Sequence, residues 1–139
     1  MKQVQHTLSM RPREQGLLEI TGEVAAWVRG QGIGTGLLTV FCQHTSASLI
    51  IQENADSDVQ RDLETFFSGL VREDPALYHH TTEGPDDMPA HIRSVLTATQ
   101  LSIPVAGGRM ALGTWQGIYL FEHRARPPTR LLLLHVVGE

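Results

Sequence analysis

The segment of residues 79–92 reads HHTTEGPDDMPAHI, and the fold can be predicted outward from it, because its second half begins a helix. Pro89 suits a first helical turn, where the N–H that proline lacks would have no partner in any case. Asp86 and Asp87 lie just before it, where the dipole of a helix favours negative charge. The same segment is rich in imidazole, carboxylate and hydroxyl groups, so it carries candidate chemistry as well as structure.

The residues that follow have the periodicity of an amphipathic helix. Ile92, Val95 and Leu96 recur at i, i+3 and i+4, and we therefore expect them to form the buried face of this helix. His91 lies one position before that face, at the border between core and solvent. From such a position an imidazole can point into a cleft without being buried.

Composition limits the class of protein. The chain has 139 residues, 41% of them hydrophobic and 19% charged, which suits one soluble globular domain over residues 1–139. The net charge of −4 argues against binding to nucleic acid, which needs a basic patch. No long apolar run and no signal-peptide core are present, so we expect a cytoplasmic protein without membrane association. The single cysteine, Cys42, cannot form an internal disulfide.

Strand patterns fill most of the remaining chain. Beside a helix near residues 20–28, we expect two short strands in 3–20 and buried strands in 37–42 and 130–137. Alternating residues over 114–124 indicate a further strand. This order predicts an α+β fold, a single-domain, mostly antiparallel β-sandwich with about three helices.

Two apolar faces are notable in this prediction. The long helix expected after residue 56 carries a stripe that we expect in the core, formed by Val59, Leu63, Phe66, Phe67 and Leu70. Trp115, Tyr119 and Phe121 share one face of the strand over 114–124. We expect a domain of this size to leave the second face uncovered and available for another subunit.

Three of the seven histidines are candidate metal ligands, namely His44, His80 and His91. Each lies beside hydroxyls, carboxylates or a helix start, whereas His6 and His135 lie within expected strands. Three neutral imidazoles with one open position are typical of a catalytic zinc site. Local spacing alone does not establish the site, because HExxH, HxH and CxxC motifs are absent.

Several polar residues have both a structural and a functional interpretation. Asp86 and Asp87 can cap the helix that follows them. Thr45, Ser46 and Ser48 can satisfy the backbone of a turn, or they can hold an anionic substrate. Both interpretations stay open on the residues alone.

Glu122 and Arg124 lie two residues apart on one strand face. They either form an ion pair with each other, or Arg124 binds phosphate or carboxylate while Glu122 orients it. No Gly-x-Ser-x-Gly pattern is present, so a serine hydrolase is not expected. The glycine run of residues 30–36 follows a helix rather than a strand, which is the reverse of the order in a dinucleotide-binding loop.

Four motifs, in order along the chain, resemble the signature of the YjbQ-like family, named secondary thiamine-phosphate synthase. They are QHTSASL at 43–49, ENAD at 53–56, EGPDDMPAHI at 83–92 and GTWQGIYL-x-E at 113–122. The resemblance covers essentially the whole chain. It implies a compact α+β sandwich that assembles as a homotrimer, with a polar pocket near the subunit interface. It also implies thiamine-phosphate synthase activity, and a metal ion at the clustered histidines in some members.

The resemblance and the polar context together select the candidate site residues. The candidate catalytic residues are His91, His80, Glu53 and Asp87. The candidate substrate- or anion-binding residues are Thr45, Ser46, Asn54, Thr114, Gln116, Glu122 and Arg124. His44, His80 and His91 are the candidate metal ligands, and Glu83 also matches the family pattern. His79, His123 and His135 fall outside that pattern and are not expected in the site.

The leading hypothesis is a transferase that joins a pyrimidine pyrophosphate to a thiazole phosphate and releases pyrophosphate, as a main or a side activity. It needs charge stabilisation on phosphorylated substrates, from a divalent metal or from Arg124. We expect zinc, with magnesium as the alternative for a pyrophosphate substrate. Two other hypotheses remain: a metal-dependent hydrolase with Glu53 or Asp87 as general base, and a non-catalytic homotrimer that binds a small anion or metabolite.

Overall fold

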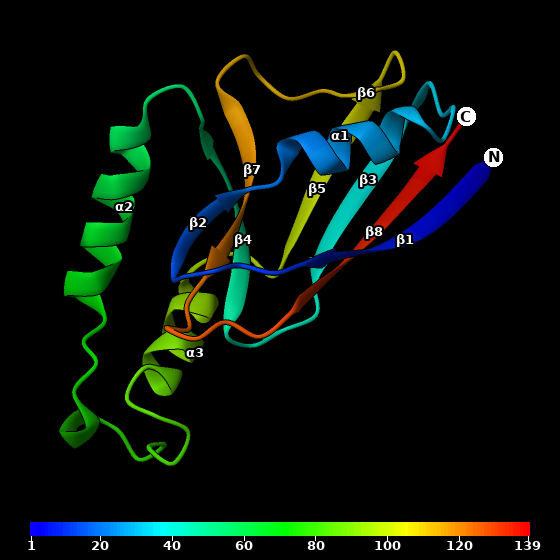
Figure 1. Ribbon diagram of the computed structural model, residues 1–139. Helices are drawn as coiled ribbons and strands as arrows, with labels where there is room; N and C mark the ends of the chain where they lie inside the picture. The colour runs from blue at the N-terminus through cyan, green and yellow to red at the C-terminus, as the bar shows by residue number, and fades with distance from the viewer.

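Eight strands form two antiparallel sheets in the computed structural model, which describes residues 1–139 (Figure 1). The strands are β1 (Lys2–Met10), β2 (Gly16–Glu19), β3 (Thr35–Cys42), β4 (Ala47–Glu53), β5 (Gln100–Ala106), β6 (Arg109–Met110), β7 (Gln116–Glu122) and β8 (Arg130–Gly138). The five-stranded sheet has the order β1-β8-β3-β5-β6, and the three-stranded sheet has the order β2-β7-β4. The expected α+β fold of mostly antiparallel strands with three helices is confirmed.

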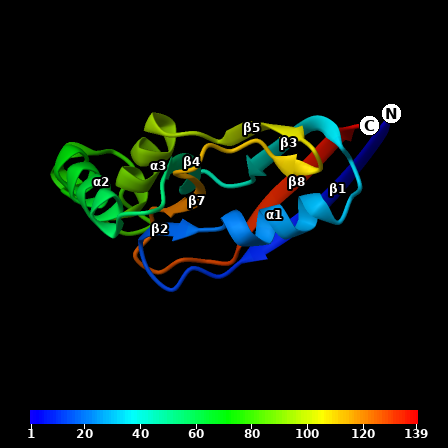
Figure 2. The same ribbon diagram turned by 90° about the horizontal axis from the view of Figure 1, so that it is seen from above.

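The helices are α1 (Thr21–Arg29), α2 (Ser57–Leu70) and α3 (Asp87–Leu96), with a short 3-10 helix, η1 (Pro75–Leu77). α1 contacts β6 and β7, whereas α2 and α3 lie at the end of the molecule opposite the chain termini (Figure 2). β1 and β8 pair over their whole lengths, with Lys2 opposite Gly138, so the two termini lie side by side. None of the helices is long and apolar enough to cross a membrane.

The hydrophobic core lies where the two sheets and α1 meet. Val24 and Val28 enter it from α1, and alternate residues of the strands complete it: Leu38, Val40, Ile118, Leu120, Leu132, Leu134 and Val136. Successive side chains of a strand point to opposite faces, so each of these strands has an inner face in the core and an outer face. Burying each core side chain stabilises the fold by about 1.5–3 kcal/mol, because its apolar surface is removed from water.

The expected core role of the α2 stripe is wrong. None of the α2 residues is buried, and the side chains of Phe66 and Leu70 are 60% and 56% exposed. α2 lies beside the three-stranded sheet, and the Phe67 ring contacts the Phe121 ring edge to face at 5.4 Å. A stripe at helical spacing indicates that a helix has an apolar side, but the spacing does not say how much of that side a neighbour covers.

The expected buried face of α3 is also wrong. Val95 and Leu96 are 83% and 53% exposed, and Ile92 is only half-buried. The buried residues are Asp87, Pro89, Ala90 and Arg93. This polar face can be buried because its charged groups have partners: Arg93 donates to the carbonyl oxygen of Val71 at 2.9 Å, and Asp87 accepts from several donors described below.

The three residues of the expected apolar face, Trp115, Tyr119 and Phe121, differ in burial. Trp115, which precedes β7, is 61% exposed, but Tyr119 and Phe121 are only 4% and 3% exposed within the single chain. α2 provides the cover for Phe121, and Gln60 of α2 donates to the Tyr119 hydroxyl at 3.0 Å. This face is therefore not the uncovered surface that the sequence led us to expect.

Candidate functional site

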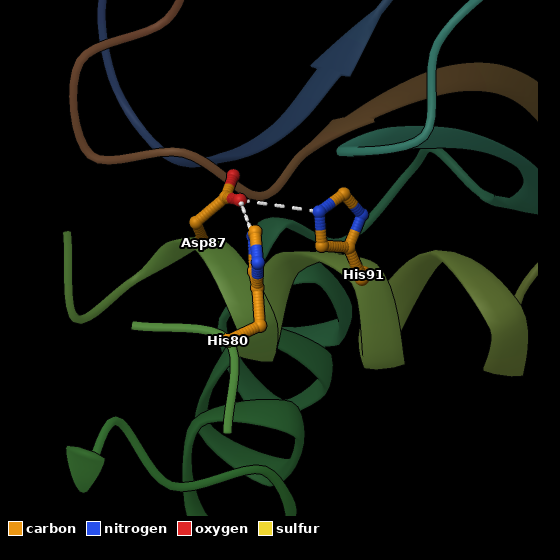
Figure 3. A group of neighbouring side chains, drawn as sticks. All are labelled: His80, Asp87 and His91. Carbon is orange, nitrogen blue, oxygen red and sulfur yellow. Dashed lines mark hydrogen bonds and ion pairs between the residues drawn. The ribbon is translucent and has the colours of Figure 1, made fainter. Parts of the chain in front are cut away.

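Two imidazoles and one carboxylate meet at the N-terminal end of α3 (Figure 3). The Nε2 atoms of His80 and His91 lie 2.6 Å and 3.1 Å from the same oxygen, Oδ2 of Asp87. The Asp87 side chain is 3% exposed, whereas the side chains of His80 and His91 are 39% and 32% exposed. The group therefore has a buried carboxylate at its base and imidazoles that solvent can reach.

Local sequence explains how the three side chains come together. Asp87 and His91 are four residues apart on α3, which places them on one side of the helix. His80 comes from the preceding loop, which turns back at Gly84 with a φ of +102°, a conformation that favours glycine. The backbone N–H of Asp87 then donates to the carbonyl oxygen of Gly84 as the helix begins. The segment of residues 79–92 therefore supplies all three side chains of this group.

The second ring nitrogen of His91 fixes its tautomer. Nδ1 lies 2.9 Å from the carbonyl oxygen of Thr45, which can only accept, so Nδ1 carries the proton. In the neutral imidazole, Nε2 is then an unprotonated acceptor facing a carboxylate oxygen at 3.1 Å. Two lone pairs at this distance repel, so the arrangement needs a proton or a cation between them. Such a carbonyl-oriented imidazole is the usual form of a histidine metal ligand.

Arg124 connects this group to the adjacent strand end. Its Nη1 donates to Oδ1 of Asp87 at 2.6 Å, its Nε donates to Oδ2 of Asp86 at 3.0 Å, and its Nη2 donates to the carbonyl oxygen of Glu83 at 3.0 Å. The interpretation of Arg124 and Glu122 as a mutual side-chain pair is therefore wrong. Glu122 instead accepts from the backbone N–H of Arg124 at 3.0 Å.

These contacts shift the pKa values of both aspartates downward. Burial by itself would raise the pKa of Asp87, but the hydrogen bond from His80 and the charges of Arg124 and His91 outweigh it. For Asp86, burial is likewise outweighed by hydrogen bonds from Ala125 and Arg124, so its pKa is also lowered. Both carboxylates remain ionised well below neutral pH and can counterbalance positive charge.

A buried ion pair beneath the site was not found from the sequence. Arg130 is 1% exposed and donates through Nε to Oε1 of Glu122 at 2.7 Å, and its Nη2 pairs with Oε2 of the same residue. Arg130 also donates to the side chain and the backbone of Ser46 at 3.0 Å each. The available signal was an arginine at the start of an apolar strand, since a charge buried there requires a partner.

The structure places His44 apart from the other two candidate metal ligands. Its Nε2 accepts the backbone N–H of Leu131 at 2.8 Å, and it is not in the group formed by His80, Asp87 and His91. Burial and the charge of Arg130 lower the pKa of His44, which therefore favours the neutral acceptor form. His44, Thr45 and Ser46 line a wide surface hollow instead.

The remaining candidate residues lie at the ends of β4 and β7 that are distant from Glu122. Glu53 is opposite Gln116 in the β4–β7 ladder, whereas Ala47, at the other end of β4, is opposite Glu122. At about 3.3 Å per residue, the two ends are about 20 Å apart. This far group consists of Glu53, Asn54, Thr114 and Gln116. Within one chain, it is separate from the group around Asp87.

Comparisons with known proteins find one family, and its members match nearly the whole chain. The family model described as UPF0047 protein YjbQ-like matches residues 6–139. The UPF0047 protein sll1880 of Synechocystis sp. is 54% identical over 138 residues, covering 99% of this chain and 94% of that protein. The UPF0047 protein YjbQ of Escherichia coli O157:H7 is 41% identical over 136 residues, covering 97% and 98% of the two chains.

Solved structures have the same fold. A YbjQ-like protein of unknown function from Sulfolobus solfataricus P2 superposes with a TM-score of 0.90 at 23% identity, covering 99% of each chain. At this identity, the likeness shows a shared fold only. A conserved hypothetical protein of Thermus thermophilus has a TM-score of 0.84 at 32% identity, covering 95% of this chain and 99% of that one.

Proposed function

The chain belongs to the YjbQ-like UPF0047 family, and we propose that it is an enzyme that acts on a phosphorylated small molecule with one divalent metal ion. The observation that carries the proposal is the convergence of the Nε2 atoms of His80 and His91 on Oδ2 of Asp87. The orientation of His91 supports it, because the carbonyl oxygen of Thr45 holds Nδ1 and leaves Nε2 as the nitrogen that would bind a metal ion.

The donor set fits zinc. Two imidazole nitrogens and one carboxylate oxygen, all within 4.8 Å of one another, are the ligand types that zinc takes at catalytic sites with three protein ligands. Magnesium prefers oxygen ligands, so the two imidazoles favour zinc over magnesium. We propose His80, Asp87 and His91 as the ligands, and Asp87 replaces His44 in the set that we expected from the sequence. A bound ion would supply positive charge and polarise a phosphoryl oxygen.

The charge balance around the site supports a need for such an ion. Four acidic residues, Glu83, Asp86, Asp87 and Glu122, surround it, against two arginines, Arg124 and Arg130. Both guanidinium groups already bind carboxylates. The two arginines that contact these carboxylates are therefore already paired, and an additional cation would strengthen the attraction for a phosphorylated substrate.

For the reaction, we propose the thiamine-phosphate synthase type: transfer of a pyrimidine group from its pyrophosphate to a thiazole phosphate, with release of pyrophosphate. In this proposal Thr45 and Ser46, which line the open hollow, bind phosphate oxygens through their hydroxyls, and the carbonyl oxygen of Thr45 contacts His91. Arg124 orients the carboxylate of Asp87.

A metal-dependent hydrolase is the second candidate. The partial exposure of His80 and His91 favours it, because water can reach the group directly. Glu53 does not serve as general base for this group within one chain, since it lies at the far end of β4. Turnover of simple phosphate esters, without turnover of the two thiamine precursors, would select this candidate. Tight binding of anions without any turnover would instead favour the non-catalytic trimer.

Metal analysis of the untagged protein tests the proposal directly. We expect about one zinc per chain and a higher melting temperature on adding zinc. His91→Ala should abolish both effects and lower any turnover at least about a hundredfold. It should cost less than about 1.5 kcal/mol in stability, because the side chain is partly exposed. His79→Ala, which changes an exposed neighbour outside the group, is the matched control and should behave like the wild type.

We also propose that the chain assembles as a homotrimer, as the family resemblance implies. The outer face of the five-stranded sheet supports it, because Leu37, Phe41 and Leu131 are each about two-fifths exposed there. These residues come from the adjacent strands β3 and β8. Exposed apolar side chains on neighbouring strands form the kind of patch that marks a subunit contact.

A further inference from the structure

A second polar cavity lies beneath α2, separate from the group of His80, Asp87 and His91. Its volume is about 120 Å³, and its walls come from α2, α3, the end of β7 and the turn before β2. The polar residues that line it are Gln15, Glu64, Ser68, Arg93, Glu122 and His123. None of the three proposed metal ligands lines it, so what it binds does not depend on the proposed function.

Two buried polar atoms, both in residues that line this cavity, have no hydrogen-bond partner. They are Nδ1 of His123 and Nε of Arg93, and they are the only such side-chain atoms in the chain. His123 is fully buried and Arg93 is 5% exposed. Buried polar groups are almost always paired, because leaving one unpaired costs free energy. A shared partner in the cavity that both residues line would satisfy the two atoms.

The other atoms of both side chains are already held. Nε2 of His123 lies 2.9 Å from Oγ of Ser48, which in turn lies 2.5 Å from Oγ1 of Thr97. Arg93 donates through Nη2 to the carbonyl oxygen of Val71 at 2.9 Å, and its Nη1 lies 3.8 Å from a carboxylate oxygen of Glu73. These contacts leave only the two unpaired atoms for a ligand. When Ser48 donates to Nε2, the neutral imidazole carries its proton on Nδ1 and offers it to the cavity.

We propose that the cavity binds a small monocarboxylate anion, which accepts hydrogen bonds from Nε of Arg93 and Nδ1 of His123. A carboxylate has two acceptor oxygens, one for each donor, and its charge strengthens the hydrogen bond from the guanidinium group. Both residues line the same cavity, so one ligand can reach both side chains.

Size and charge select this class of anion. The cavity, at about 120 Å³, has room for a ligand of a few heavy atoms. The carboxylate of Glu64 also lines the cavity, and its Oε1 is engaged by the backbone N–H of Leu17 at 2.9 Å. A second negative charge on the ligand would meet this carboxylate, which disfavours phosphate relative to a monoanion.

Acetate, with neutral acetamide as its matched analogue, tests the proposal by nitrogen NMR of the His123 ring and the Arg93 side chain. We expect acetate to shift both signals saturably and acetamide to leave them unchanged. Glu64→Gln, which keeps an acceptor for Leu17, should tighten acetate binding. His123→Phe should weaken it about tenfold, as the loss of a hydrogen bond to a charged group predicts.

Other outcomes would overturn the proposal. If neither signal responds to acetate, or if acetamide shifts both signals equally, the cavity holds only water. Inorganic phosphate binding more tightly than acetate would contradict the monocarboxylate class. The acetate and acetamide titrations use the wild-type chain, so they remain decisive even if His123→Phe does not fold. Both signals lie outside the proposed metal site, so a negative result here leaves the proposed function untouched.

Discussion

At the residue scale, Arg130 and Glu122 form the most deeply buried pair in the protein, at 1% and 0% exposure. Removing one partner leaves an uncompensated buried charge, so we expect Arg130→Met to destabilise the fold by about 3–5 kcal/mol. The double variant Arg130→Met, Glu122→Gln should be more stable than that single variant, because no ionised group is then left alone. Urea unfolding of both proteins measures the difference, and equal stability would contradict the coupling.

His123 gives a second prediction at this scale, through pH. Burial and the charges of Arg93 and Arg130 lower the pKa of His123 to about 3, against 6.5 ordinarily. Between these two pH values the unfolded chain binds a proton that the folded chain does not, so stability falls as the pH falls. The slope from this residue is at most about 1.4 kcal/mol per pH unit.

The test compares urea unfolding of the wild type and His123→Gln between pH 6.5 and pH 5. The variant should lose most of the slope, while retaining the smaller part due to His44, whose pKa is also lowered. A slope unchanged in His123→Gln would show that another group causes the acid sensitivity.

At the element scale, α3 shows why periodicity located the helix but not its buried face. Ala90 is fully buried and Val95 is 83% exposed. We expect Val95→Lys to change stability by less than about 0.5 kcal/mol, as at other surface positions. Ala90→Leu should cost about 1–3 kcal/mol by overpacking. Urea unfolding of the two variants decides this, and the reverse order would restore the face expected from the sequence.

The strands were predictable from the sequence because their signal is local. The nearly continuous apolar run of residues 131–137 is enough to identify β8 as a strand, but the run predicts burial on both faces, whereas only the face of Leu132, Leu134 and Val136 lies in the core. The face of α3 was not predictable, because its buried groups are charged and their partners lie far away in the chain. Arg124 and Arg93 are satisfied by residues that are 38 and 22 positions distant.

The candidate site likewise has one part that the sequence predicts and another part that it does not. Asp87 and His91 come together through helical spacing, and His80 follows through a short glycine turn, so the motif predicts their proximity. His123 was set aside because it lies outside the family pattern, yet the structure buries it completely with an unpaired nitrogen. No local pattern gives the position of a cavity between α2 and β7, which depends on how far the helix lies from the sheet.

At the scale of the whole molecule, the outer sheet face provides a test of assembly. We expect sedimentation equilibrium at micromolar concentration to give the mass of three chains. Leu131→Glu places a charge in the exposed apolar patch and should produce monomers, whereas Glu14→Gln, at an exposed position in the loop before β2, should not. A wild-type protein that sediments as a monomer would remove the trimer and any site shared between subunits.

The pairing of β1 with β8 has a consequence for the connectivity of the chain. The N-terminal amine lies 3.9 Å from a carboxylate oxygen of Glu139, so a short peptide linker could join the two ends with little disturbance. The protein could then be circularly permuted, with new ends opened in the exposed residues 72–76. Such a permutant would change the order in which the strands are synthesised while leaving the group around Asp87 on one continuous segment.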